Sequence, residues 1–420
     1  MLNKLKPKSE FTRNVLTLMT GTTIAQAIPI AISPILTRIY TPEDFGVLAL
    51  FMGLVMILSS IISGRYELAI LLPEKEEDAI NIFVLAFLII STISFILFLI
   101  IFIFNDFFTE LLNNQEIKYW LYFIPIVTFF IGLFNLLTYY NTRLKNYKDI
   151  ANASIIKALV LVSIQLFVGF FKDGVAGLIN GQIFSQMFAN LKLFKNIFLN
   201  QKNFFSSIDI QNIKKVAIRY KDFPKFSIWS VLLNTSVQNL VNILIPILFS
   251  YATMGFYALG QRVLGLPSTI LGKSVGQVFF QQSVQEKKKT GSTRKIFLST
   301  FKKLFFISFI VFTIIFFTIT DIVNFVFGQD WIESAKIIQI LIPLFFIRFI
   351  SSSLSTTMIV YEKQKMELLI NLILFTTTIM ILLLNQKNFF NFLELYSFFM
   401  SINYLILLGY FYSLSKGKQK

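Results

Sequence analysis

The sequence of 420 residues contains no cysteine and no histidine. These absences exclude disulfide bonds, zinc sites of the usual kind, thiol nucleophiles and imidazole acid–base chemistry. Charged residues are also scarce: they make up 14% of the chain, whereas a soluble globular protein has about a quarter. Hydrophobic residues account for 55%, and long apolar runs recur from one end to the other. This composition indicates a membrane protein that crosses the bilayer many times.

About twelve stretches contain the ~20 mostly apolar residues that cross a bilayer. Backbone groups in lipid must be satisfied within the segment, and no barrel-like alternation appears, so we expect an all-α polytopic fold. Lys and Arg concentrate in alternate connections, which predicts that both termini are cytoplasmic. The net charge of +16 thus sorts by membrane side and does not indicate a nucleic-acid partner.

The two halves of the chain resemble each other. The stretch "AQAIPIAISPIL" (25–36) aligns with "VQNLVNILIPIL" (237–248), and further matches follow in the same order. Two halves with the same orientation form a parallel repeat about an axis along the membrane normal. We therefore expect two six-helix lobes around a central cavity, at 1–195 and 225–420, joined by a basic cytoplasmic linker at 196–224. The positive-inside rule accounts for the linker's charge, and contact with acidic headgroups is a lesser alternative.

Amide and hydroxyl side chains follow one face of the first and seventh expected spans. Asn234, Gln238 and Asn242 recur at every fourth position, which places them on one face of a helix. Thr22 and Gln26 lie at equivalent positions in the first span. Polar groups in a span either line a hydrated cavity or hydrogen-bond between helices. The repeat favours a polar cavity wall, and the interhelical alternative stays open.

Two prolines occupy matching positions in these spans, Pro34 in the first and Pro246 in the seventh. Proline removes a backbone donor and loosens a helix. Each span could therefore contain either a moving hinge or a static kink, and the sequence does not distinguish the two.

Basic residues occur inside the expected spans, where no Asp or Glu is found near the middle. Arg262 lies ~10 Å into the eighth span, expected over 255–280, given the rise per residue. Lys273 follows it on nearly the same face, and Arg348 lies near the middle of the tenth span. These bases lie deep in the expected membrane, where a cation without an acidic partner is energetically costly. They predict a cationic chamber for an anionic ligand, with carbonyl pairing as the structural alternative.

Two more bases have equally plausible structural roles. Lys157, a turn or two into the fifth span, either snorkels to the interface or joins the chamber. Arg65, at the end of the second span, either pairs with Glu67 as an interfacial anchor or binds ligand. Amides and hydroxyls suit sugars, and arginine matches phosphate oxygens bidentately. A ligand with both features and a lipid tail is a polyprenyl-diphosphate oligosaccharide.

These residues resemble the Wzx-type flippases for polysaccharide repeat units (O-antigen or capsule), within the multidrug/oligosaccharidyl-lipid/polysaccharide (MOP) exporter superfamily. The resemblance rests on "PILTRIYTPEDFGVLALF" (34–51), "GRYELAILLPEKEEDA" (64–79) and "GFYALGQRVLGLPSTILGKSVGQVFFQ" (255–281). It implies a bacterial inner-membrane protein, without cofactor, that translocates undecaprenyl-diphosphate-linked glycans by alternating access for O-antigen, lipopolysaccharide or other surface polysaccharide. Its partners would be that glycan, membrane lipids and other polysaccharide-assembly proteins.

The family's basic residues carry over to Arg65, Arg262 and Lys273, whereas Arg348 and Lys157 match in kind only. The main alternative is an ion-coupled exporter of another substrate, which would need an intramembrane carboxylate. A glycan polymerase or ligase is a weaker alternative, because the expected outer loops are short. An ATP-driven pump would need a phosphate-binding loop of the GxxxxGK[ST] type, and the sequence has none.

Overall fold

The computed structural model describes residues 10–172, 174–200, 204–268, 272–384 and 388–417. Helices make up nearly all of these residues, and no strand occurs among them. The chain divides into two compact units, Met1–Ile243 and Leu244–Lys420. The division falls inside a helix, later in the chain than the linker expected at 196–224.

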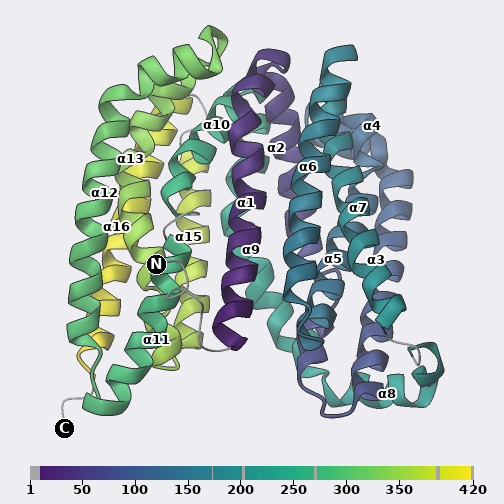
Figure 1. The fold of residues 1–420 in the computed structure, drawn as a ribbon. Helices are drawn as coiled ribbons and strands as arrows, with labels where there is room; N and C mark the ends of the chain where they lie inside the picture. Colours follow the sequence, from purple (N-terminus) through teal and green to yellow (C-terminus); the bar gives the residue numbers. More distant parts are fainter. Residues whose placement is uncertain (1–9, 173, 201–203, 269–271, 385–387, 418–420) are drawn as a thin grey trace, which may run out of the picture. The chain divides into compact units, whose positions relative to one another are not determined.

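Unit 1 contains the first eight α-helices and most of the ninth (Figure 1). Their bounds, with three short helices interleaved, are α1 (Glu10–Ile39), α2 (Pro42–Ser59), η2 (Tyr66–Leu71), α3 (Glu76–Leu111), α4 (Ile117–Leu121), α5 (Ile124–Arg143), α6 (Tyr147–Phe171), α7 (Ala176–Asn200), η3 (Phe205–Ser207), α8 (Ile210–Arg219), η4 (Phe223–Ser227) and α9 (Ile228–Leu248).

Unit 2 contains the end of α9 and the remaining helices. These are α10 (Tyr251–Pro267), α11 (Lys273–Thr290), α12 (Arg294–Ile322), η6 (Val323–Phe327), η7 (Gln329–Trp331), α13 (Glu333–Leu354), α14 (Thr357–Val360), α15 (Gln364–Leu384) and α16 (Phe389–Ser415).

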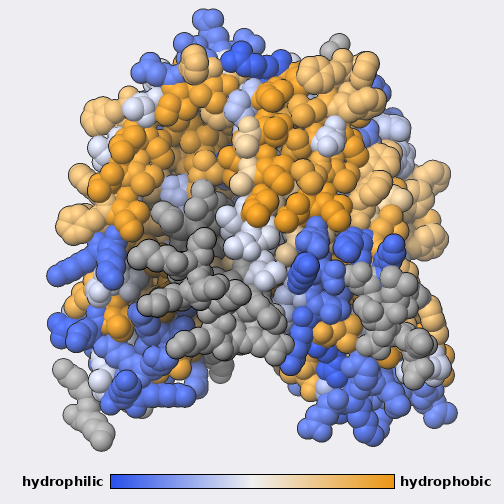
Figure 2. All heavy atoms as spheres, viewed as in Figure 1, coloured by the Kyte–Doolittle hydropathy of each residue, from blue (hydrophilic) through white to orange (hydrophobic). Residues whose placement is uncertain are grey.

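Nine helical segments of the described chain are long and apolar enough to cross a membrane. In the face of unit 1 shown in Figure 2, apolar side chains cover these segments, and hydrophilic ones gather around α8. The eighth expected span, over 255–280, corresponds to α10, which ends at Pro267, and α11, which begins at Lys273. Residues 269–271 between them lie outside the described part of the chain.

Local sequence explains where several helices begin and how closely they pack. Thr41 caps α2 in a capping box: its Oγ1 accepts from Asp44 N–H, and Asp44 Oδ2 accepts from Thr41 N–H at 2.9 Å. Pro42 follows at the first helical position, where a missing donor costs nothing. In the α1–α6 contact, a Cβ on Gly21 would overlap Ala151 Cβ. Small residues of this kind let membrane helices approach closely.

Pro34 lies inside α1 and Pro246 inside α9. Each helix continues through its proline, so the matched prolines occupy equivalent places within continuous helices. Their role as moving hinges stays a prediction.

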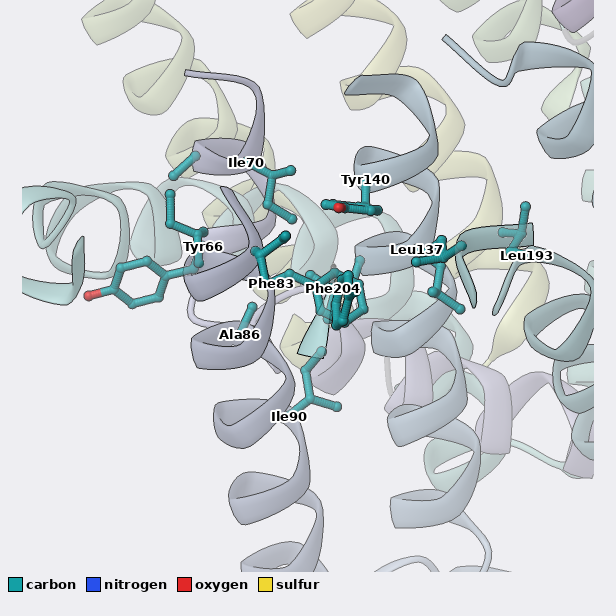
Figure 3. Packing of buried hydrophobic residues seen from close by; sticks show 14 of the residues in the cluster. Tyr66, Ile70, Phe83, Ala86, Ile90, Leu137, Tyr140, Leu193 and Phe204 are labelled. Carbon is teal, nitrogen blue, oxygen red and sulfur yellow. The ribbon is translucent and has the colours of Figure 1, made fainter. Parts of the chain in front are cut away.

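A hydrophobic core of unit 1 lies near one end of α3 and α5 (Figure 3). Phe204 packs edge-on against Phe83 of α3 and Tyr140 of α5, with ring centroids 5.5 and 5.8 Å away. Phe204 belongs to the segment that we expected to be the basic linker, at 196–224. The described part of this segment forms η3, α8 and η4, and it buries Phe204, Val216 and Tyr220 in the core of unit 1.

A guanidinium clamp holds the connection between η2 and α3. Arg143, the last residue of α5, donates from Nε to Glu76 Oε2 at 2.9 Å and from Nη1 to the carbonyls of Ile70 and Pro73, at 3.0 and 2.7 Å. The Tyr140 hydroxyl donates to the other Glu76 oxygen at 2.8 Å. This geometry fixes the segment that follows Arg65 against α5.

Candidate functional site

Arg65 lies where the chain leaves α2 and turns into η2. Its φ of +64° and that of Gly64, +61°, place two consecutive residues in the left-handed region. A side chain in that region costs about 1–2 kcal/mol, so contacts around Arg65 must hold it there. The Arg65 N–H donates to Ser63 Oγ at 3.3 Å, which is one such contact.

Glu67 is the ion-pair partner of Arg65. Arg65 Nη1 lies 3.1 Å from Glu67 Oε1, and Ser63 Oγ donates to Glu67 Oε2. Glu67 is only 3% exposed, and the Arg65 side chain is 21% exposed. Within the described residues, the buried Arg65 Nε has no hydrogen-bond partner. The pairing that we gave as the structural alternative is therefore present, and the guanidinium keeps one donor unused.

Neighbouring tyrosines connect this turn to other elements of unit 1. Tyr139 of α5 is close enough to interact electrostatically with Arg65 and Glu67. The Tyr66 hydroxyl donates to the Ala217 carbonyl of α8 at 3.0 Å. Burial raises the pKa of the Tyr66 phenol above its ordinary value. The phenol therefore keeps the proton of this hydrogen bond throughout the neutral pH range.

The amide row of α9 is present as predicted on one helix, and its members have different partners. Gln238 Nε2 donates to Asn234 Oδ1 at 2.9 Å, so this bond lies within α9 and does not join two helices. Asn242 Oδ1 is buried and has no partner among the described residues. Its Cβ packs near Gly53 of α2. An unsatisfied buried acceptor is costly, which makes Asn242 the candidate of this row for water or ligand.

The corresponding face of α1 is less informative. Thr22 Oγ1 donates to the carbonyls of Leu18 and Met19 in its own helix, at 2.9 and 3.0 Å. Gln26 is partly exposed on α1. Neither observation tests the predicted polar wall.

Lys157 lies on α6, and its Nζ is 5.1 Å from the centre of the Phe134 ring of α5. This is a cation–π distance. No ion pair of Lys157 occurs in the described part of the chain. Phe134 therefore provides partial compensation for a cation in an apolar helix.

The bases of unit 2 lie on three different helices. Arg262 is half-buried on α10, and Arg348 is half-buried on α13. Lys273 is the first residue of α11, and its side chain lies outside the described residues. Arg348 interacts electrostatically with Tyr257 of α10 and with Tyr396 and Tyr404 of α16. Its guanidinium carbon is 5.7 Å from the Phe345 ring centre.

Sequence reasoning missed three features of these sites. It named Glu67 as a possible partner of Arg65 but did not predict that this carboxylate is buried and accepts from Ser63; the spacing of Ser63 and Glu67 was an available signal. It also missed the tyrosines around Arg348, although Tyr396 and Tyr404 are eight residues apart, on one face of α16. The Arg143 clamp depends on backbone carbonyls, which leave no sequence pattern.

The described residues contain no group of three or more His, Cys, Asp or Glu side chains placed to hold a metal ion. The polar side-chain groups of these sites are guanidinium groups, amides and phenols. Such groups bind anions and hydroxyl-rich molecules by hydrogen bonding.

Solved structures of transporters share this fold. An inward-facing multidrug-resistance MATE family transporter of the MOP superfamily matches with TM-score 0.66 and 12% identity, covering 94% of this chain and 93% of its own. The lipid II flippase MurJ in an inward closed conformation matches with TM-score 0.71 and 15% identity, covering 95% and 86%. A MATE transporter of Vibrio cholerae has TM-score 0.58 and 12% identity, covering 96% and 95%. At these identities the likeness concerns the fold.

The apolar helices and this shared fold define a multi-pass membrane protein with the fold of these structures. Residues 35–336 match the family described as polysaccharide biosynthesis protein. The chain belongs to this family. No curated protein sequence matches it.

Proposed function

We propose that the protein is a flippase that translocates undecaprenyl-diphosphate-linked oligosaccharide repeat units across the bacterial inner membrane. It would work by alternating access, with both termini in the cytoplasm, in the synthesis of O-antigen or another surface polysaccharide. The observation that carries this proposal is the family match over residues 35–336 on a fold shared with a lipid II flippase. On this proposal it is a transporter of the Wzx type and performs no covalent chemistry.

Arginines and amides have separate roles in this proposal. Arg65 has a partly exposed guanidinium with an unused donor, and a diphosphate supplies acceptors of matching charge. Arg262, Lys273, Arg348 and Lys157 would add positive potential along the path. The amide of Asn242 would bind water or sugar hydroxyls, together with Gln238, Asn234, Gln26 and Thr22.

One observation favours a second candidate, an ion-coupled exporter of another substrate. Such a protein needs a carboxylate in the membrane that binds a cation, and Glu67 is a buried carboxylate. However, both Glu67 oxygens already have partners, Arg65 on one and Ser63 on the other. A carboxylate in an ion pair is a poor cation site, so the flippase is the better-supported function.

Complementation separates these functions. A strain that lacks its repeat-unit flippase accumulates lipid-linked units and loses surface polysaccharide. Expression of this protein should restore the polysaccharide and remove the accumulated units, provided that the host's sugars suit it. A protein that instead lowers drug susceptibility in a pump-deficient strain, and leaves lipid-linked units unchanged in hosts with several different repeat units, would be an exporter of another substrate.

A further inference from the structure

Helix α8 (Ile210–Arg219) and the residue that follows it carry three rows of side chains. Val216 and Tyr220 are one turn apart and are 2% and 8% exposed, so they form the face packed on the core of unit 1. Gln211, Lys215 and Arg219 form a second row, exposed and entirely polar. The third row combines both characters: Ile210 and Ile218 are 72% and 68% exposed, with the exposed Lys214 between them.

The two exposed rows adjoin, because Ile218 and Gln211 are seven residues apart and lie on the same side of the helix. This exposed side therefore holds large aliphatic side chains beside lysine and arginine groups. The water–lipid interface stabilises both, because an isoleucine enters the acyl boundary while a lysine extends to the headgroups.

The helix is fixed in place by hydrogen bonds to unit 1. Tyr66 donates to the Ala217 carbonyl at 3.0 Å, and Asn212 Nδ2 donates to Asp78 Oδ1, near the start of α3, at 2.9 Å. Figure 1 shows α8 lying across this end of α3. Helix α3 is one of the membrane-spanning candidates, so α8 lies at the end of a span.

Exposed aromatic residues at the start of α9 and just before it are also typical of a membrane–water interface. Trp229, in the first turn of α9, is 64% exposed, and Phe226 before it is 61% exposed. Trp is enriched at membrane–water interfaces. Lys225 lies with its Nζ 5.2 Å from the Phe226 ring centre, as in a side chain that covers an apolar ring and keeps its charge near headgroups.

The charge of this segment favours anionic lipid. Between 210 and 225 the bases Lys214, Lys215, Arg219, Lys221 and Lys225 outnumber a single acid, Asp222. Asp209 caps the helix by accepting from the N–H groups of Gln211 and Asn212. Basic groups at this depth attract acidic phospholipids from the cytoplasmic leaflet.

We propose that the Ile210–Lys214–Ile218 face of α8 is a binding surface for anionic phospholipid headgroups, which anchors the linker between the two halves of the chain at the membrane. The surface takes lipids of the bilayer, not the transported substrate. It is therefore independent of the proposed function and can be tested without any transport measurement.

The absence of cysteine from the chain makes a single-site probe straightforward. The full-length protein with Ile218→Cys carries a nitroxide label and is reconstituted in vesicles of phosphatidylcholine alone, or of phosphatidylcholine and phosphatidylglycerol in equal amounts. The measurement is the ratio of collision rates with oxygen, which partitions into lipid, and with a water-soluble nickel chelate. Arg219→Cys, at an exposed position about 100° around the helix from Ile218, is the control.

We expect the ratio at Ile218 to rise roughly twofold or more when phosphatidylglycerol is present, while the ratio at Arg219 stays low in both vesicles. Lys214→Gln with Lys221→Gln, added to the Ile218→Cys protein, should remove most of that rise, as should high salt. The proposal is overturned if Ile218 is as accessible to the chelate as Arg219 in both vesicles. It is also overturned if Ile218 is shielded from both reagents, which would show that a protein surface covers it.

Discussion

Arg65 and Glu67 form an ion pair, Nη1 to Oε1 at 3.1 Å, across a turn in which Arg65 has a left-handed backbone. The carboxylate is buried, and the guanidinium is partly exposed. Glu67 thereby orients the base and supports its strained backbone. An anionic ligand would have to share Arg65 with Glu67 or replace it, so that binding can change the conformation of the turn.

The first prediction separates the charge of Arg65 from its backbone. In the double variant Arg65→Gly with Glu67→Gln, glycine relieves about 1 kcal/mol of left-handed strain, and glutamine avoids an unpaired buried carboxylate. We expect thermal stability close to that of the wild type, but export of polysaccharide reduced at least tenfold, measured in the complementation strain.

The matched control for this variant is Lys145→Gly, because Lys145 also has a left-handed backbone, with φ +59°, and is exposed. It relieves the same strain without touching Arg65, and export should be unchanged. Wild-type export by the double variant would show that Arg65 has only a structural role.

The second prediction concerns the unsatisfied amide of Asn242. Asn242→Leu has nearly the same shape and removes a buried acceptor without a described partner. Stability should be equal or up to about 1 kcal/mol higher, as measured by thermal unfolding in detergent. Export should fall severalfold if this amide binds water or sugar.

Asn239→Leu serves for comparison, because Asn239 Nδ2 donates to the Thr235 carbonyl at 2.9 Å. That variant should lose a little stability and keep its export. If Asn242→Leu were instead strongly destabilised, Asn242 would be a structural residue of the α2–α9 contact.

The third prediction tests the guanidinium clamp. Arg143→Lys keeps the charge but cannot donate to Glu76 and two carbonyls in the same fixed plane. We expect a loss of about 2 kcal/mol in the free energy of unfolding, seen as a lower midpoint in thermal unfolding. Tyr140→Phe, which removes one hydrogen bond to Glu76, should cost about 1 kcal/mol.

Lys148→Gln, at an exposed position near the start of α6, is the control for loss of a nearby charge, and its midpoint should stay at the wild-type value. Equal midpoints for Arg143→Lys and the wild type would mean that a single charge at this position is sufficient.

The fourth prediction concerns the attachment of the linker. Asn81 is fully buried; its Nδ2 donates to the Ser207 carbonyl at 2.9 Å, and its Oδ1 accepts from Asp209 N–H at 2.9 Å. Asn81→Ala removes both bonds. We expect faster tryptic cleavage after Lys214, Lys215 and Arg219, measured by limited proteolysis and mass spectrometry.

Asn81→Asp can still accept from Asp209 N–H but cannot donate to Ser207, so it should show an intermediate cleavage rate. If both variants are cleaved at the wild-type rate, the burial of Phe204, Val216 and Tyr220 is sufficient to hold the linker in place.

The fold class was accessible from the sequence because the bilayer imposes length and polarity on each span. Apolar runs are local features, and so are the capping threonine of α2 and the prolines of α1 and α9.

The sites could be predicted only in part from the sequence. The helical spacing correctly placed Asn234, Gln238 and Asn242 on one helix, but gave no indication that Gln238 bonds to Asn234 while Asn242 Oδ1 is left without a described partner. It located Arg65 and named Glu67 as a possible partner. It did not predict that Glu67 is buried or that Arg65 adopts a left-handed backbone.

The sequence by itself determined that this protein crosses a membrane many times, that it carries bases and amides within its spans, and that it resembles a polysaccharide flippase. These properties follow from composition and spacing. Only the tertiary structure decided which charges are paired and how the linker is attached. Glu67 meets Arg65 through a backbone turn, Arg143 binds carbonyls more than sixty residues away in the chain, and Phe204 enters a core formed by α3 and α5. Such contacts depend on the three-dimensional approach of distant segments, for which local residue patterns carry no signal.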